Sequence, residues 1–279
     1  MIERLRITAL ADNSTGAPGI LAEHGLSLLI EAGDRRILFD TGQGKVLGDN
    51  LAALQIALDP LDAIVLSHGH YDHTGGLPIA LDQACPKAVF VHPAALEPKF
   101  AKQDPPPFRS IGIPAPSLEA LKAVGDRIVW TRSATEVIPG VWCTGEIPRQ
   151  DAGRRGDPVF YLDADGRTPD PLADDQALVV ETTHGLAVVA GCAHAGVVNT
   201  LDLVCRLAGR GEIHALVGGL HLGRASQKQL ENTASALALR RLEWIAPCHC
   251  TGMNAHACLR ARFPARVLDF SAGCNLVFE

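Results

Sequence analysis

Positive charge and long apolar runs are both scarce in this chain of 279 residues. Lys and Arg number 25 against 31 Asp and Glu, which gives a formal net charge of −6. Nucleic-acid-binding surfaces carry clustered positive charge, so this balance argues against a nucleic-acid partner. The longest apolar run, around Leu186 to Ala190, is far too short to span a bilayer. We therefore expect neither nucleic acid nor a membrane as a partner.

The chain also lacks a C-x-x-C pair, although it contains eight cysteines. This usage is typical of reduced thiols and does not require a disulfide framework. Residues Met1 to Leu10 alternate apolar and charged side chains, a pattern that predicts a strand and lacks the apolar core of a signal peptide. The expected location is therefore the cytoplasm.

What is present is enough apolar sequence for a sizeable core, with 47% hydrophobic and 20% charged residues. Strands are predicted at 26–31, 36–40, 63–66, 88–92, 127–131, 137–143, 158–162, 177–182, 186–190, 213–217, 243–246, 266–270 and 276–278, and helices at 50–58, 77–84, 197–207, 227–240 and 254–262. Two strand-then-helix halves of similar length predict two sheets packed face to face with helices outside. We expect an α/β fold of four αββα layers, formed by one domain over residues 1–279.

Proline interrupts this pattern between residues 93 and 126. Because proline is excluded from helix interiors and central strands, the segment is expected to hold no regular helix or central strand. It is predicted to be a surface excursion or lid that shapes either the pocket or a dimer contact, and a homo-oligomer is left open. The prolines on which this rests are Pro105, Pro106, Pro107, Pro114 and Pro116.

The strongest chemical signal is the segment 67–76, Ser-His-Gly-His-Tyr-Asp-His-Thr-Gly-Gly, which directly follows a predicted buried strand. It holds three imidazoles and one carboxylate within six residues: His68, His70, Asp72 and His73. Such nitrogen and oxygen donors suit a transition metal such as Zn²⁺, Mn²⁺ or Fe²⁺. His68 and His70 lie two apart on an extended segment, so their side chains point the same way. The segment therefore predicts a metal-binding loop.

Three further histidines each follow a predicted strand in the second half of the chain. They are His194 in Gly-Cys-Ala-His-Ala-Gly, His221 in Gly-Gly-Leu-His-Leu, and His249 in Pro-Cys-His-Cys-Thr-Gly. The carboxyl ends of strands in an α/β sheet are where such folds place ligand sites. We expect these side chains to complete the site begun by the first loop.

The His-x-His-x-Asp-His pattern at residues 68–73 resembles the signature of the metallo-β-lactamase superfamily, and Leu-Phe-Asp-Thr-Gly at residues 38–42 resembles its first motif. Taken together, the pattern at residues 68–73 and the three later motifs resemble one branch of this superfamily more narrowly. That branch is named for a dihydropterin ribofuranosylaminobenzene phosphate synthase of methanopterin biosynthesis. The resemblance covers almost the whole chain. It implies the metallo-β-lactamase type of four-layer sandwich, and it is more specific for fold than for substrate.

The resemblance assigns a role to each histidine of the pattern. His68 and His70 match the ligands of a first metal, and Asp72 and His73 those of a second. His249 matches the last metal ligand of the superfamily pattern, and His194 is the best remaining candidate for a metal ligand. The implied cofactor is one or two divalent transition-metal ions, with zinc favoured over manganese or iron.

Some positions depart from the common pattern or carry two interpretations. Cys192 stands where many relatives have a bridging Asp after Gly, and it is either a thiolate ligand or a buried filler, with filler slightly favoured. Asp40 is either an acceptor that orients a ligand imidazole or a turn former. Glu146 is expected near the substrate. His24 is expected to have no functional role, metal binding included, although it precedes a strand in the half that feeds the site and could approach the substrate. Cys248 and Cys250 are expected to be packing or redox bystanders.

The function that follows is a metallohydrolase acting on a small polar or phosphorylated ester-type substrate, for which a pterin-related phosphate is one candidate. Asp72 is expected to orient the attacking water and shuttle its proton, and His221 to stabilise an oxyanion, protonate a leaving group or complete the metal shell. Two interpretations apply to Arg149, Arg154 and Arg155: they are solvated surface residues, as paired arginines usually are, or they contact a substrate phosphate. The alternatives are a mononuclear iron enzyme that uses oxygen and a non-catalytic metabolite-binding protein.

Overall fold

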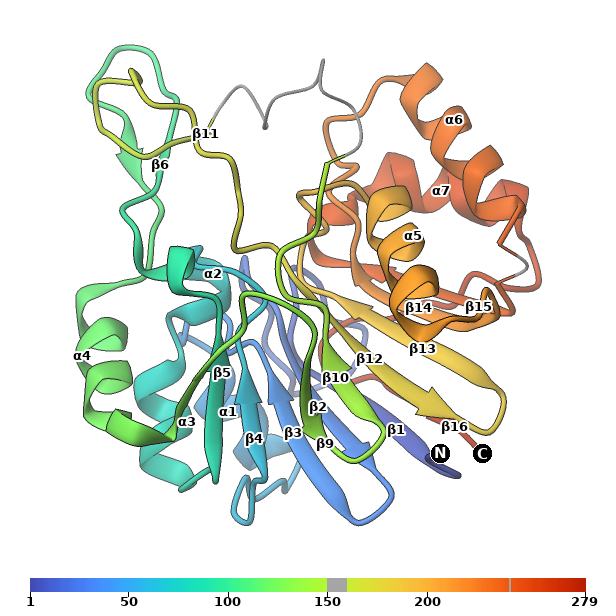
Figure 1. The fold of residues 1–279 in the computed structure, drawn as a ribbon, viewed down its shortest axis with the longest axis horizontal. Helices are drawn as coiled ribbons and strands as arrows, with labels where there is room; N and C mark the ends of the chain where they lie inside the picture. Colours follow the sequence, from blue (N-terminus) through green and yellow to red (C-terminus); the bar gives the residue numbers. More distant parts are fainter. Residues whose placement is uncertain (150–159, 241) are drawn as a thin grey trace.

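Three β-sheets form the framework of the molecule, which the computed structural model describes over residues 1–149, 160–240 and 242–279 (Figure 1). The first sheet has the order β16-β1-β2-β3-β4-β5-β8 and contains β1 Leu5–Ala11, β2 Ser27–Ala32, β3 Arg35–Phe39, β4 Ala63–Val65, β5 Ala88–Val91, β8 Ile128–Trp130 and β16 Asn275–Phe278. The second has the order β15-β14-β13-β12-β10-β9 and contains β9 Thr135–Ile138, β10 Val141–Cys143, β12 Ala177–Thr182, β13 Gly185–Ala190, β14 Ile213–Gly219 and β15 Trp244–Cys248.

Successive residues of the central strands enter different cores because strand side chains alternate between faces. In β3, Ile37 and Phe39 pack into the core between the two large sheets, whereas Leu38 faces the opposite way. In β13, Val189 enters the same central core and Val188 an outer one. Both faces of these strands are covered, so their sequences are continuous apolar runs.

Helices cover the outer face of each large sheet. The first sheet is covered by α1 Leu47–Ala53, α3 Leu77–Gln83 and α4 Ala115–Val124, and the second by α5 Val197–Ala208, α6 Gln227–Ala238 and α7 Met253–Arg262. The order helix, sheet, sheet, helix confirms the predicted αββα arrangement (Figure 1). The apolar core shared by both large sheets supports our proposal that residues 1–279 form one domain.

The third sheet has the order β11-β6-β7 and contains β6 Phe100–Ala101, β7 Arg109–Ser110 and β11 Phe160–Tyr161. We call these three strands the arm. In Figure 1, β6 and β11 project beyond α2 (Tyr71–Thr74), on the opposite side of the molecule from α5, α6 and α7. The arm joins the proline-rich segment to a part of the chain about 60 residues further on.

The structure corrects three of the expected elements. The proline-rich segment does contain a regular helix, α4, because Pro116 occupies its first turn, where no intrahelical amide bond is lost. The strand expected at 137–143 is divided between β9 and β10 by a turn at Gly140, which has φ +80°. The strand expected at 266–270 is reduced to one bridge between Ile245 and Val267.

A polar cluster around Asp62 joins the beginning of β3 to the beginning of β4, and it allows a test of how surface charges contribute to stability. Asp62 Oδ1 accepts from Arg35 and from Lys87 Nζ, at 2.8 and 2.6 Å, and Oδ2 accepts from the Arg36 amide at 3.0 Å. Burial by itself would raise the pKa of Asp62, but these donors outweigh it and lower the pKa to about 2.

Replacing Asp62 with asparagine is expected to cost about 1 kcal/mol of unfolding free energy at neutral pH, because the partners are solvent-exposed. The folded-state pKa lies below the ordinary value of 3.8, so the contribution is present above that pH and is lost as the pH falls through about 2. Denaturant unfolding of both proteins across this range checks the prediction. An equal difference in stability at every pH would contradict it.

Among the described residues, no helix has the length and apolar character required to cross a membrane.

Candidate metal centre

The predicted site residues meet at one edge of the two large sheets, where several strands end. Asp40 follows β3, the loop beginning at Ser67 follows β4, and Cys192 and His194 follow β13. His221 follows β14, and His249 begins the short helix after β15. Parallel neighbours deliver their carboxyl ends to the same edge, so residues far apart in sequence converge there.

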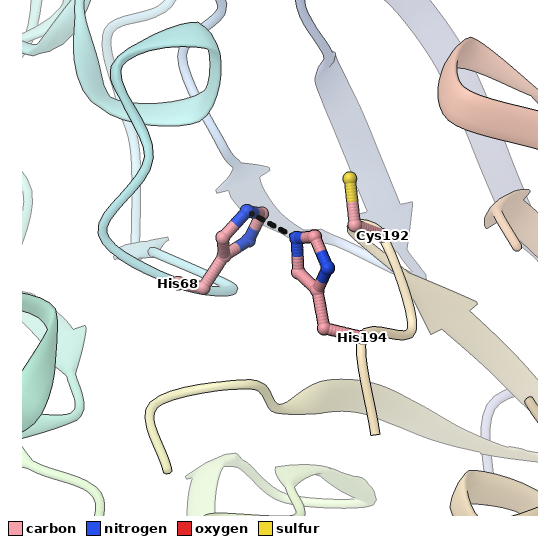
Figure 2. Close-up of side chains that lie close together, drawn as sticks. All are labelled: His68, Cys192 and His194. Atoms are coloured by element: carbon pink, nitrogen blue, oxygen red, sulfur yellow. Dashed lines mark hydrogen bonds between the residues drawn. The ribbon is translucent and has the colours of Figure 1, made fainter. Parts of the chain in front are cut away.

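The first donor group consists of His68, His70 and His194. Nε2 of His68 lies 2.9 Å from Nδ1 of His70 and 3.3 Å from Nε2 of His194. Figure 2 shows the rings of His68 and His194 with these nitrogens facing each other, one from the first half of the chain and one from the second. Ring nitrogens of His70 and His194 therefore both lie within 3.3 Å of Nε2 of His68.

The second donor group consists of Asp72, His73 and His249. Nε2 of His73 lies 3.1 Å from Nε2 of His249, and Oδ2 of Asp72 lies 3.6 Å from the latter and 3.9 Å from the former. All three side chains are buried. Their donor atoms belong to the same edge of the sheets as the first group.

Cys192 lies between the two groups. Its Sγ is 3.3 Å from Nε2 of His73, and it belongs both to a set with His68 and His194 and to a set with His73 and His249. The donor atoms within each set lie within 4.8 Å of one another. Figure 2 shows Cys192 beside His194, on the loop that follows β13. Both interpretations of Cys192, as a thiolate ligand and as a buried packing residue, are consistent with this position.

Asp40 makes the hydrogen bonds expected of an acceptor that orients the site. Its Oδ2 contacts Nδ1 of His73 at 2.7 Å and accepts from Ser67 Oγ at 2.6 Å, while Oδ1 accepts from the Ser67 amide at 2.7 Å. Ser67 Oγ also contacts Nδ1 of His68 at 2.9 Å. A β-carbon at Gly191 would lie 2.0 Å from Ser67 Oγ, so this network requires glycine there.

Backbone strain is concentrated around the cluster. Asp40, Ala193, His221 and His249 all have positive φ angles between 50° and 58°. Such angles are uncommon for residues other than glycine and persist where the surrounding structure holds them. The loops are therefore held in place by their contacts.

The buried imidazoles of the site have pKa values shifted in opposite directions. Burial lowers the pKa of His70 to about 3 and moves the pKa values of His68 and His194 well below the ordinary value, so these rings are neutral. Burial would also lower the pKa of His73, but the carboxylates of Asp40 and Asp72 outweigh it and raise the pKa to about 9. Burial would raise the pKa of Asp72, but His73 and His24 hold it well below its usual range.

Three contributors to the site escaped the sequence analysis. Asn13 Oδ1 contacts Nδ1 of His249 at 2.8 Å, and Asp12 Oδ1 accepts from the amide of His249 at 2.7 Å. His24, expected to lack a metal role, places Nε2 3.1 Å from Oδ2 of Asp72. Asp12 and Asn13 come shortly after the strand predicted from Met1 to Leu10, and that position was the available signal.

His221 and Cys250 extend the cluster on the side of the second sheet. The ring of His221 lies 4.3 Å from that of His194, and its amide donates to Sγ of Cys250 at 3.3 Å. Cys250 and Cys192 form a further donor set with His221. Cys248 instead packs in the central core, as expected.

A cavity of about 2020 Å³ opens over the cluster. Arg109 and Phe160 of the arm line one side, and Asn199 of α5 and Asn232 of α6 line the other. Arg149 also lines it and donates to the carbonyl of His194 at 2.8 Å.

Two other predictions concerned residues near the substrate. Glu146, expected near the substrate, is exposed and is not among the residues that line this cavity. Arg154 and Arg155 lie outside the described residues.

The donor chemistry fits a divalent transition-metal ion. Nε2 of His68 faces two other ring nitrogens, and a ring nitrogen with one proton or one lone pair makes only one good hydrogen bond. Imidazole nitrogens bound to tetrahedral zinc at about 2.0 to 2.1 Å lie about 3.3 Å apart, as do those of His68 and His194. One group that could hold metal is therefore His68, His70 and His194, and another is Asp72, His73 and His249. The thiol of Cys192 lies within reach of both.

The comparisons with known proteins agree with this geometry. A sequence model described as the Metallo-beta-lactamase superfamily matches residues 21–201. A protein of Methanocaldococcus jannaschii named 7,8-dihydropterin-6-methyl-4-(beta-D-ribofuranosyl)-aminobenzene-5'-phosphate synthase is 30% identical over 289 residues, covering 99% of this chain and 98% of that protein. An uncharacterized protein of the same organism is 32% identical over 252 residues, covering 89% of this chain and 91% of its own length.

Among solved structures, a metal-dependent hydrolase of the beta-lactamase superfamily aligns with a TM-score of 0.83 and 32% identity, covering 98% of each chain. Proteins with this fold are generally enzymes, and the fold typically binds divalent metal ions. The matched sequence model, the near-complete coverage by relatives at 30% identity or above, and the four-layer architecture lead to one conclusion: the chain belongs to the metallo-β-lactamase superfamily.

Proposed function

We propose that the protein is a metal-dependent hydrolase of a small polar or phosphorylated ester-type substrate. The observation that carries the proposal is that two groups of metal-donor side chains lie at one large cavity, which is lined by His70, Asp72, His194 and His249. The first group is His68, His70 and His194, and the second is Asp72, His73 and His249. A divalent transition-metal ion held by these donors, zinc in first place, would activate water as a nucleophile at neutral pH and would polarise an ester or phosphoryl group.

Asp72 and His221 are the proposed catalytic side chains. Asp72 is ionised, contacts the imidazoles of His24 and His249 through Oδ2, and lines the cavity. It is therefore placed to accept a proton from an attacking water and to pass it to His24. His221 lines the cavity beside His194 and is placed to donate to an oxygen that becomes negative during the reaction.

The cavity lining supports an anionic substrate. Lys102, Arg109, Arg149 and Arg224 line it, whereas its carboxylates are Asp72 and Asp202. Guanidinium groups bind phosphate oxygens through paired hydrogen bonds. The M. jannaschii relative is named for a product that carries a phosphate, which makes a pterin-related phosphate one candidate. Because that relative is named a synthase, hydrolysis is our own proposal for this chain.

A panel of model esters tests the proposal. Protein purified anaerobically is analysed for bound metal, stripped with a chelator, and reloaded with zinc, manganese or iron. Hydrolysis of a phosphodiester, a phosphomonoester and a lactone is then measured for the loaded and stripped forms. We expect at least one ester class to be hydrolysed by the loaded form and to fall to the background rate on stripping.

Two results would replace the proposal with another function. Bound iron together with thiol-dependent oxygen uptake and no ester hydrolysis would indicate an oxygen-using enzyme. Background rates with every metal, together with tight binding of a metabolite, would indicate a binding protein.

A further inference from the structure

Lys99 is a buried cation that the proposed chemistry does not use. Its side chain is 1% exposed, and lysine is almost never fully buried unless it is paired. Nζ donates to Oδ2 of Asp170 and to Oδ1 of Asp174, both at 2.9 Å, and both carboxylates are buried. Burying a charge triad of this kind costs solvation free energy on folding, so its presence is weak evidence for a purely stabilising role.

One carboxylate of this triad holds the metal-binding loop. Oδ2 of Asp174 accepts from the amide of Gly69 at 2.7 Å, and Gly69 lies between His68 and His70. A β-carbon at Gly69 would lie 2.1 Å from the carbonyl oxygen of Ala95, so the loop is pressed against its neighbours. The position of Asp174 therefore fixes the point from which both imidazoles project.

The other carboxylate belongs to the segment that carries the arm. The amide of Asp170 donates to the carbonyl of Phe160 at 3.0 Å, and Phe160 pairs with Ala101 two residues after Lys99. The carbonyl of Lys99 accepts from Ile111 at 2.8 Å, which fixes the far side of the arm. The ring of Phe160 then lies 5.1 Å from that of His70.

We propose that Lys99 is a positioning residue that joins the arm to the metal-binding loop through Asp170 and Asp174. Its ammonium bonds both carboxylates. That of Asp174 also accepts from the loop amide of Gly69, and the backbone amide of Asp170 bonds Phe160 of the arm. Through Asp174, Lys99 orients His68 and His70. Through Asp170, it places Phe160 in the cavity wall beside His70. This inference rests on the proposed function, in which the loop binds metal and the cavity binds substrate.

Two measurements test the two contacts of Lys99 separately: metal affinity tests the contact with Asp174, and KM tests the contact with Asp170. Metal affinity is measured by competition with a chelator, and KM by hydrolysis of bis-para-nitrophenyl phosphate or whichever ester of the panel is turned over. All measurements are made well below each variant's unfolding temperature, with folding checked by circular dichroism. Replacing Asp174 with asparagine is expected to weaken metal binding by about 10- to 100-fold, as loss of an outer orienting partner does at metal sites.

Replacing Asp170 with asparagine is expected to raise KM by about tenfold, because about 1.4 kcal/mol of substrate contact is lost when the arm shifts, with metal affinity within about threefold of the wild type. Lys99→Met is expected to produce both effects, and Lys99→Arg to restore both towards the wild type because it keeps the charge. Lys87→Met removes an exposed cation whose Nζ contacts Asp62 at 2.6 Å, and this matched control is expected to change neither quantity.

Folded Lys99→Met with unchanged metal affinity and unchanged KM would overturn the inference. If that variant does not fold, Asp170→Asn decides, because KM equal to the wild type, or weaker metal binding without a change in KM, would contradict the assigned roles. A wild-type protein that binds no metal and hydrolyses no ester would instead defeat the proposed function.

Discussion

Replacing His68 with alanine is expected to abolish tight metal binding and to lower metal-dependent hydrolysis by about a thousandfold. His68 is the shared member of the first donor group, because its Nε2 faces both Nδ1 of His70 and Nε2 of His194. Metal-ion catalysis supplies several kcal/mol of transition-state stabilisation, and about 4 kcal/mol corresponds to a thousandfold in rate. Metal affinity by chelator competition and kcat/KM for the best ester are the measurements.

The control for this variant is His184→Ala. His184 is an exposed histidine near the chain terminus, where its ring contacts the carbonyl of Glu279, and it lies outside the cluster. We expect this control to keep the metal affinity and rate of the wild type. Equal hydrolytic rates for His68→Ala and the wild type at saturating metal would contradict the proposed function.

Replacing Asp40 with asparagine is the second substitution with a large expected effect. The Asp40 carboxylate is fully buried and serves Ser67 and His73 through three hydrogen bonds. An amide keeps one acceptor and presents a donor in place of the other, so one partner loses its bond. We expect metal affinity to fall by about 10- to 100-fold and unfolding free energy to fall by about 1 to 3 kcal/mol.

Chelator competition and denaturant unfolding of the metal-free protein measure the two effects of Asp40→Asn separately. Asp49→Asn, at an exposed position in the first turn of α1, is a matched control that removes one carboxylate away from the site. An unchanged metal affinity in Asp40→Asn would show that Asp40 acts only as a turn former, the other interpretation of its sequence position.

The sequence predicted the layers and the main donors because both depend on local patterns. Apolar runs such as 186–190 identify strands buried on both faces, and a donor directly after such a strand projects at the edge where α/β folds bind ligands. The residues 68–73 therefore predicted half of the cluster. His194 and His249 were found by the same rule, and the structure brings them to the first loop.

The parts that escaped prediction depend on contacts between distant segments. Asn13 contacts His249 across 236 residues, and no local pattern marks that pair. Lys99 looks like an ordinary surface lysine in its proline-rich segment, and only the fold buries it against Asp170 and Asp174. Helix α4 was missed because the prolines were counted without regard to position, and Pro116 is tolerated in a first turn.

Cys192 shows why residue type alone did not settle its role. A free cysteine is usually a small buried side chain, and burial here does raise the pKa of its thiol well above the ordinary value. The position of its Sγ in donor sets with both groups is a property of the folded loops after β4, β13 and β15. We therefore keep both interpretations of Cys192, and the metal positions below also separate them.

Crystals grown with zinc and measured on both sides of the zinc absorption edge provide the most direct test of the central claim. The account predicts an anomalous peak between the ring nitrogens of His68, His70 and His194, and a second peak, if two ions bind, bounded by Asp72, His73 and His249. A peak within bonding distance of Cys192 Sγ would make that thiol a ligand. No peak at either donor group in zinc-saturated crystals would contradict the account.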